Sequence, residues 1–167
     1  MRPEGLSRVD KVFDTVVKPG RWPDRRPVTI GANHLHGEPV PYAEAVAGRF
    51  EPFAEGDRWG PDWDTTWFHV TATVPDEWAG REVVLVVHLG FGGATGFGAE
   101  GQVWVDGVPL HGISPNHREV AVSAPAAGGE PVDLYIEAAA NPPAPPGDPG
   151  ALLALAALVL AEKLLPG

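Results

Sequence analysis

Between residues 66 and 140 the sequence repeats one pattern, in which short stretches of alternating apolar and polar residues are separated by turn residues. In 66–74, TWFHVTATV, every second residue is apolar, which is typical of a strand with one buried face. The stretches REVAV at 118–122 and PVDLYIEAAA at 131–140 alternate in the same way. No helical periodicity lies between them, and 21 glycines and 19 prolines without a regular period supply many turns. The pattern therefore predicts an all-β domain built as an antiparallel β-sandwich.

Two further stretches refine this prediction. EVVLVVHL at 82–89 is apolar on both faces, which favours a central strand. QVWVDGVPL at 102–110 predicts a tight hairpin, because Asp106-Gly107 suits the positive φ angles of a type I′ turn. A chain of 167 residues is long enough for one domain with a sizeable core.

The two ends of the chain show different patterns. Residues 7–18, SRVDKVFDTVVK, predict an amphipathic helix that Ser7 caps and Pro19-Gly20 ends. Its apolar residues recur at the i, i+3, i+4, i+7 spacing of one helix face, and they are Val9, Val12, Phe13, Val16 and Val17.

Near the C-terminus, the apolar run ALLALAALVLA at 151–161 predicts a short buried or docking helix. Eleven helical residues rise only about 16 Å, which is too short to cross a bilayer. We therefore expect no membrane association through this run. The predicted organisation is an N-terminal helix and lead-in at 1–22, a sandwich at 23–140, a proline-rich linker at 141–150 and a helical tail at 151–167.

Charge and composition exclude several classes of function. A formal net charge of −10 argues against general nucleic-acid and acidic-membrane binding, since both require a positive surface. The absence of cysteine excludes disulfides and thiolate metal sites. The N-terminus has no apolar run of signal-peptide length, so we expect a cytoplasmic protein.

The residues that carry chemistry in other proteins form no catalytic motif here. His34 and His36 share one side of an extended segment, with Glu38 following, but no third and fourth metal ligands are evident. The glycine-rich segment 90–101 lacks the spacing of a phosphate-binding loop, and Ser114 lies in a typical turn sequence. We therefore assign no catalytic residue and no metal ligand in this chain.

The stretch WGPDWDTTWF is the strongest candidate for binding. Trp59 and Trp63 can stack on a sugar ring, and Asp62 and Asp64 can accept hydrogen bonds from sugar hydroxyls or hold calcium. The alternative is structural: the rings cover one end of the sandwich, and Trp67 begins a strand with its neighbour Phe68 on the opposite face. The sequence leaves these interpretations open and favours the structural one.

Over residues 5–142 the chain resembles the N-terminal β-sandwich domain of cytosolic-type α-mannosidases of glycoside hydrolase family 38. The resemblance rests on WGPDWDTTWFHVTATVPDEWAGREVVLVVHLG, AEGQVWVDGVPLHGISPNHREVAV and GGEPVDLYIEAAANP, and it implies a jelly-roll, galactose-binding-like sandwich. It also implies that a divalent metal, usually zinc, and an aspartate nucleophile belong to a following catalytic domain. The family's His-x-Asp ligand motif is absent here, so no catalytic or metal residue is carried over and no cofactor is expected in this chain.

These inferences lead to two functional expectations. The first is a non-catalytic accessory domain that packs on an α-mannosidase catalytic domain or on a homo-oligomer partner and is inactive alone. The second is an independent carbohydrate-binding module that uses Trp59 and Trp63 as its sugar platform.

Overall fold

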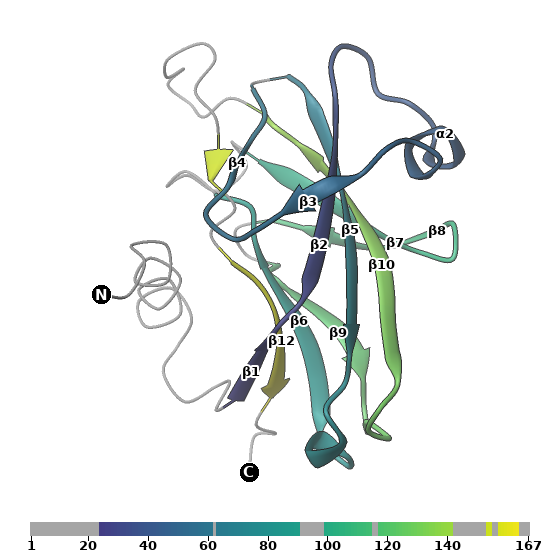
Figure 1. The fold of residues 1–167 in the computed structure, drawn as a ribbon, viewed down its shortest axis with the longest axis vertical. Coiled ribbons are helices and arrows are strands. Elements are labelled where there is room, and N and C mark those ends of the chain that lie inside the picture. The colour runs from purple at the N-terminus through teal and green to yellow at the C-terminus, as the bar shows by residue number, and fades with distance from the viewer. Residues whose placement is uncertain are drawn as a thin grey trace.

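Most of the strands belong to two antiparallel sheets that face each other (Figure 1). This architecture comes from a computed structural model, and it confirms the predicted all-β, antiparallel class. The structure describes residues 24–61, 63–90, 99–114, 117–141, 153–154 and 157–163.

The larger sheet has six strands, each antiparallel to its neighbours. In spatial order they are β3 (Glu51–Phe53), β2 (Thr29–Leu35), β5 (Thr65–Thr73), β10 (Pro131–Ala139), β7 (Glu100–Val105) and β8 (Val108–Ile113).

The smaller sheet has four strands, and two further strands form a separate pair. The four are β1 (Asp24–Pro27), β12 (Ala157–Lys163), β6 (Glu82–His88) and β9 (Glu119–Ser123). The pair is β11 (Leu153–Ala154) with β4 (Arg58–Trp59), and the described helices are α2 (Tyr42–Val46) and the 3-10 turn η1 (Asp76–Trp78).

The strands predicted from alternation are confirmed as β5, β9 and β10, and the doubly apolar stretch is confirmed as the interior strand β6. The predicted hairpin joins β7 to β8. Asp106 and Gly107 have φ angles of 50° and 77°, the left-handed values that this turn requires.

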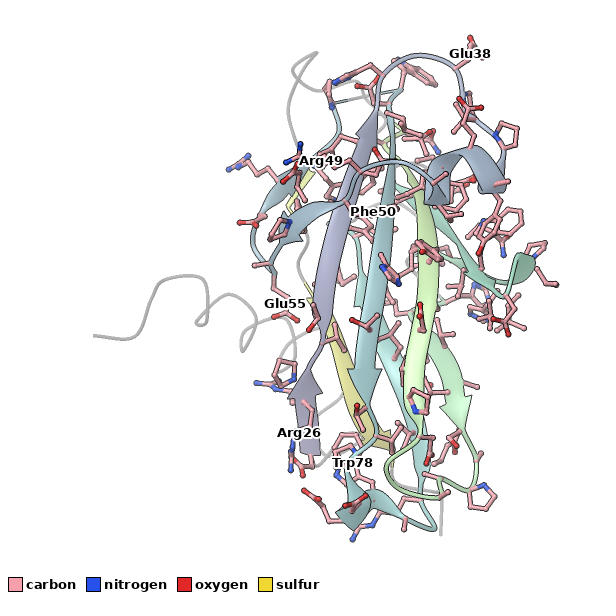
Figure 2. All side chains as sticks on the ribbon, turned by 45° about the vertical axis from the view of Figure 1, so that its right-hand side comes forward. Arg26, Glu38, Arg49, Phe50, Glu55 and Trp78 are labelled. Atoms are coloured by element: carbon pink, nitrogen blue, oxygen red, sulfur yellow. The ribbon has the colours of Figure 1, made fainter. Side chains whose placement is uncertain are left out.

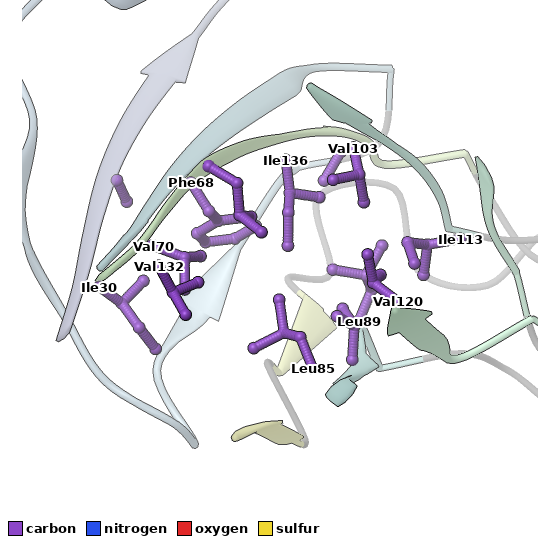
Figure 3. Packing of buried hydrophobic residues seen from close by; sticks show 14 of the residues in the cluster. Ile30, Phe68, Val70, Leu85, Leu89, Val103, Ile113, Val120, Val132 and Ile136 are labelled. Atoms are coloured by element: carbon purple, nitrogen blue, oxygen red, sulfur yellow. The ribbon is translucent and has the colours of Figure 1, made fainter. Parts of the chain in front are cut away.

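The hydrophobic core lies between the two sheets (Figure 3). On β5, Phe68 and Val70 point inward, and on β6 Leu85 faces them from the opposite sheet. These three side chains are fully buried, because period-2 alternation turns one face of each strand toward the other sheet.

The predicted C-terminal helix is wrong. Residues 157–163 form β12, which pairs with β1 on one side and with β6 on the other. The apolar run lacks a polar face, so it suits an interior strand as well as a buried helix, and only the sheet partners decide between them. The predicted N-terminal helix at 7–18 and residues 142–150 of the predicted linker lie outside the described residues.

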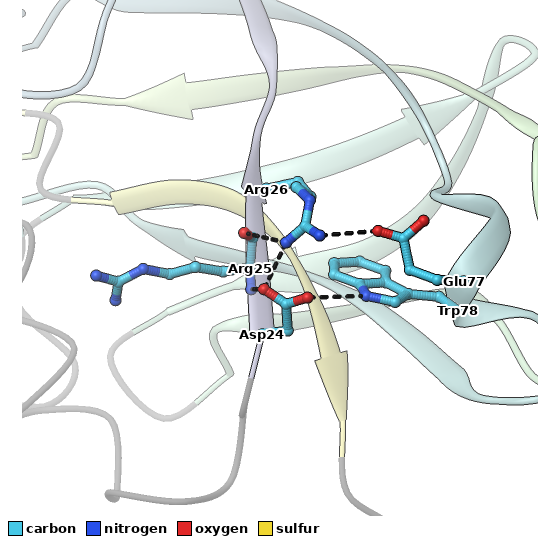
Figure 4. Close-up of polar contacts among 5 residues, drawn as sticks. All are labelled: Asp24, Arg25, Arg26, Glu77 and Trp78. Carbon is cyan, nitrogen blue, oxygen red and sulfur yellow. Dashed lines mark hydrogen bonds and ion pairs between the residues drawn. The ribbon is translucent and has the colours of Figure 1, made fainter.

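A cluster of polar contacts fixes the edge strand β1 to η1 (Figure 4). The Arg26 guanidinium donates to the carboxylates of Asp24 and Glu77, the latter at 2.9 Å, and its Cζ lies 5.4 Å from the Trp78 ring centroid. The Trp78 indole N–H donates to Asp24 at 3.3 Å. The hydrogen bond from Arg26 is the main reason that the pKa of Asp24 is lowered.

Candidate functional site

Trp59 is part of the core and is not a sugar platform. Its side chain is 1% exposed, and the ring meets Phe68 edge-on at 5.9 Å between centroids. The indole N–H donates to the carbonyl oxygen of Leu89 at 2.9 Å. A tryptophan at the short strand β4 can bury its ring under the end of the sandwich while satisfying its only donor. The prediction that this ring stacks on a ligand is therefore wrong.

Trp63 has the opposite environment. Its side chain is 74% exposed, the highest value among the exposed large hydrophobic residues of the described chain. Its backbone N–H donates to the Ala140 carbonyl at 2.7 Å, and the Ala140 N–H donates to the Asp64 carbonyl at 3.0 Å. Trp63 has a φ of 72°, a conformation that costs a non-glycine residue about 1–2 kcal/mol. The end of β10 thus holds an exposed indole in a strained, fixed position.

Asp64 is already engaged by the loop after β2. The His36 imidazole donates to one carboxylate oxygen at 2.5 Å, and the Gly37 N–H approaches the other at 3.4 Å. The Asp64 side chain is 15% exposed, whereas that of His36 is 78% exposed. Asp62, the remaining predicted contact, lies outside the described residues. The Asp64 carboxylate of the predicted site is therefore hydrogen-bonded within the chain.

His34 and His36 each make a side-chain hydrogen bond within the chain. His34 shares a hydrogen bond with the Thr66 hydroxyl at 2.9 Å, and its pKa is lowered by burial and, secondarily, by His36. Within the described ranges, no group of three or more His, Cys, Asp or Glu residues is placed to hold a metal ion. The described residues do not fit the zinc site that the resemblance implies for a catalytic domain.

A second aromatic group covers the outer face of the six-stranded sheet, and sequence analysis did not single it out. Trp67 of β5 is fully buried there, under Tyr42 of α2 and beside Trp104 of β7. Tyr42 also stacks on Trp104, with 5.1 Å between centroids and 25° between planes. These ring contacts hold Tyr42 against the outer face of the sheet. The sequence signal for this aromatic layer was the presence of aromatic residues at the outward positions of the alternating strands.

The same face continues toward β2 (Figure 2). Tyr135 stacks on His69 at 4.4 Å, and Phe50 lies against both rings. A side chain at Gly31 would place its Cβ 3.1 Å from the Cβ of Phe50, so glycine allows this close approach. His69 also bonds the Asp133 carboxylate at 2.7 Å. The aromatic face is thus a packed structural layer.

Glu137 is the unusual carboxyl group of this face. It lies between Gln102 and Trp67 in the strand register of β7, β10 and β5. Burial raises the pKa of Glu137, and no opposing charge is a cause of the shift. The indole nitrogens of Trp67 and Trp104 are buried without a hydrogen-bond partner among the described residues. Glu137 is one carboxyl group, whereas most glycoside hydrolases use two.

In the part of the chain that the structure describes, no helix is long and apolar enough to cross a membrane.

Comparison with known proteins identifies the family. A family model described as "Alpha-mannosidase, jelly roll domain" matches residues 26–157. Alpha-mannosidase 2C1 from Homo sapiens is 36% identical over 119 residues, which cover 69% of this chain and 11% of that protein. The Mus musculus protein of the same name is 33% identical over 114 residues, or 66% of this chain and 10% of its own length.

A more distant relative is alpha-mannosidase G from Dictyostelium discoideum, which is 25% identical over 109 residues. These residues cover 62% of this chain and 9% of that protein, so the chain spans about a tenth of the length of the relatives it matches. The family match covers most of the chain and includes strands of both sheets. The resemblance inferred from the sequence is confirmed, and the chain belongs to the family of alpha-mannosidase jelly roll domains.

Proposed function

We propose that this chain is a non-catalytic accessory domain of an α-mannosidase-type glycoside hydrolase of family 38 and that it works in the cytoplasm. Its task is to pack on a catalytic domain or on a homo-oligomer partner and to hold that partner in place. The family supports this proposal, as does the small share of each relative's length that such a domain occupies. Zinc would belong to the catalytic partner.

The exposed Trp63 side chain is the observation that carries the proposal. Tryptophan is enriched at the centres of protein interfaces, where one well-placed ring contributes much of the binding energy. The two backbone hydrogen bonds with Ala140 and Asp64 order this segment before any partner binds, which lowers the entropic cost of association. A strained, exposed indole fits a pocket on a neighbouring domain.

Activity is the first test. The purified chain, incubated with an aryl α-mannoside with and without zinc, should release no more phenol than buffer does. Turnover above that background would contradict the non-catalytic role. Circular dichroism on the same sample checks that the protein is folded, so that inactivity is not caused by unfolding.

Association is the second test. Sedimentation velocity is measured on the chain alone and after mixing with a purified α-mannosidase catalytic portion. Trp63→Ala should weaken the observed association by at least about 30-fold in Kd, as expected for a residue at the centre of an interface. Val108→Ala is the matched control, because Val108 is 60% exposed and lies on the edge strand β8. Equal weakening by both variants would contradict a special role for Trp63.

A carbohydrate-binding module is the second candidate function. The supporting observation is the exposed Trp63 ring, since a sugar can stack on an aromatic face. The burial of Trp59 leaves one ring in place of the predicted pair. Tryptophan fluorescence titrated with mannose and mannobiose tests this candidate, with Trp63→Ala as the control. A flat titration at tens of millimolar sugar would exclude it.

A further inference from the structure

The outer face of the six-stranded sheet gathers several polar groups around Glu137. This residue alternates with core residues along β10, so its side chain points away from the core. Trp67 on β5 and Gln102 on β7 are its direct partners in the register, and Trp104 lies diagonally from it, opposite Tyr135. Direct partners have Cβ atoms about 5 Å apart, and diagonal ones remain within reach of long side chains. Glu137 thus shares one patch of the sheet with two indoles.

The polar atoms of this patch are unpaired within the described part of the chain. The indole nitrogens of Trp67 and Trp104 are buried without an acceptor, although a native protein normally pairs such donors. The Gln102 amide nitrogen already donates to two backbone carbonyl oxygens, both at 3.1 Å. It therefore has no hydrogen left for Glu137. The patch offers two free N–H donors and one free carboxyl group.

Tyr42 covers the two indoles. The strands β5 and β7 flank β10, about 10 Å apart, yet the ring centroids of Trp67 and Trp104 are only 5.9 Å apart, so the rings lean together over β10. Tyr42 touches both rings through aromatic contacts. It begins α2, which has five residues and no side-chain cap. A helix this short opens at low free energy, so Tyr42 can turn aside and admit a small molecule.

Glu137 is accessible from the other side. The next outward residue of β10 is Ala139, whose side chain is a single methyl group. Glu137 itself is half-buried, so its carboxyl group still reaches the surface. A ligand can therefore approach over Ala139 and meet the carboxyl group before it reaches the indoles.

The combination of donors and acceptor selects the chemistry of the ligand. A cation would pair with the carboxylate of Glu137 but would leave both indole N–H groups without an acceptor. An anion would accept from the indoles but would be repelled by the carboxylate. A hydroxyl group both accepts and donates, so it satisfies the two kinds of group together. The patch therefore fits a neutral molecule with several hydroxyl groups.

We propose that the outer face of the six-stranded sheet binds a neutral polyol, such as a monosaccharide, at Glu137. Hydroxyl oxygens of the ligand accept from the indole N–H groups of Trp67 and Trp104, and a hydroxyl group donates to the Glu137 carboxylate. Water has the same hydrogen-bonding chemistry and is the competing occupant. This site is separate from the exposed ring of Trp63, and it does not rest on the proposed accessory role.

Nuclear magnetic resonance of the indole N–H groups tests the site. The chain has six tryptophans, so Trp→Phe substitutions assign six signals in the protein labelled with 15N-tryptophan. Methyl α-mannoside should shift the signals of Trp67 and Trp104 in a saturable way, whereas tetramethylammonium and acetate at equal concentration should not. The absence of a shift with methyl α-mannoside would overturn the proposal and leave water as the occupant. Shifts with either ion would overturn the assigned chemistry.

Two substitutions locate the bound polyol. Trp104→Phe keeps an aromatic ring but removes one N–H donor, and Glu137→Leu removes the carboxyl group. Each should weaken the binding of methyl α-mannoside by about threefold or more, as expected for a lost hydrogen bond. The matched control is Trp63→Phe, which should leave the affinity unchanged.

The control also separates this site from the sugar contact considered at Trp63. Weakening by Trp63→Phe alone would overturn the proposal and place the sugar at Trp63. Unchanged binding in Glu137→Leu would overturn it as well. The dispersion of the remaining indole signals shows for each variant that the protein is folded. Because these titrations use the chain alone, a negative result leaves the association test of the accessory role unaffected.

Discussion

On β6 the outward residues between Glu82 and His88 are Val84 and Val86, whereas on β5 they include Trp67 and His69. Both outer faces are covered, but the means differ. The aromatic face of the six-stranded sheet holds Tyr42 through ring contacts. The aliphatic face of the four-stranded sheet buries apolar area without directional ring contacts.

This difference shows that the outer faces of one sandwich can be buried in two ways, by ring contacts on one sheet and by aliphatic side chains on the other. α2 has only five residues and no side-chain cap, so it depends on the aromatic rings beneath Tyr42 for its position. Four substitutions, considered from the largest expected effect to the smallest, test this comparison.

Truncation of Trp67 should cause the largest loss. Trp67→Ala removes a fully buried ring beneath Tyr42 and is expected to lower the free energy of unfolding by about 3–5 kcal/mol. Trp63→Ala, four residues earlier, removes an exposed ring and should change it by less than about 0.5 kcal/mol. Urea unfolding followed by circular dichroism measures both. Similar losses in the two variants would show that the aromatic face does not support the fold.

On the aliphatic face, Val84→Ala is expected to lower the free energy of unfolding by about 1.5–3 kcal/mol, because the side chain is fully buried. The control is Val108→Ala on β8, where an exposed valine should contribute less than about 0.5 kcal/mol. Thermal unfolding at neutral pH provides the comparison. A negligible effect of Val84→Ala would mean that this face is not covered in solution.

His88 should make the aliphatic face sensitive to acid. Its pKa is lowered from 6.5 to about 4, first by burial and second by the nearby Arg118. The unfolded chain therefore binds a proton at a higher pH than the folded chain does. The free energy of unfolding should fall by about 1–2 kcal/mol between pH 6.5 and pH 4, after allowance for partial exposure.

The contribution of His88 is the difference between the native protein and His88→Asn, measured across this pH range. Asn keeps an acceptor for the Gly90 N–H, which donates to His88 Nδ1 at 3.1 Å. Unfolding curves that remain parallel for the two proteins at all pH values would contradict the prediction. The exposed His36, replaced by Asn, controls for changes elsewhere.

Replacement of Glu137, on the aromatic face, should change stability least of the four substitutions. Because burial raises the pKa of Glu137, ionisation of this carboxyl group opposes folding as the pH rises above the pKa of the unfolded chain. Glu137→Gln should therefore slightly increase the melting temperature at pH 7 and have little effect at pH 4. Differential scanning calorimetry at both values measures this, and a lower melting temperature at pH 7 would reveal a stabilising partner for the carboxylate.

The predicted strands show what local pattern can establish. The alternation in β5 and β10 has a period of two, so it specifies both the strand and the side that faces the core. Asp106-Gly107 specifies its turn because few residues accept two positive φ angles. The short strands β1, β3 and β4 were not predicted, since two to four residues are too few to show any period.

The candidate site was less predictable, because Trp59 and Trp63 have the same chemistry and lie four residues apart. The sequence by itself determined the all-β class, the turn at Asp106-Gly107 and the family resemblance, which rests on three stretches of the sequence. Only the tertiary structure decided that Trp59 meets Leu89 inside the sandwich while Trp63 stays outside. It also decided that residues 157–163 form a strand. Backbone preference and periodicity are local, whereas the burial of a ring and the partners of a strand depend on residues distant in the sequence.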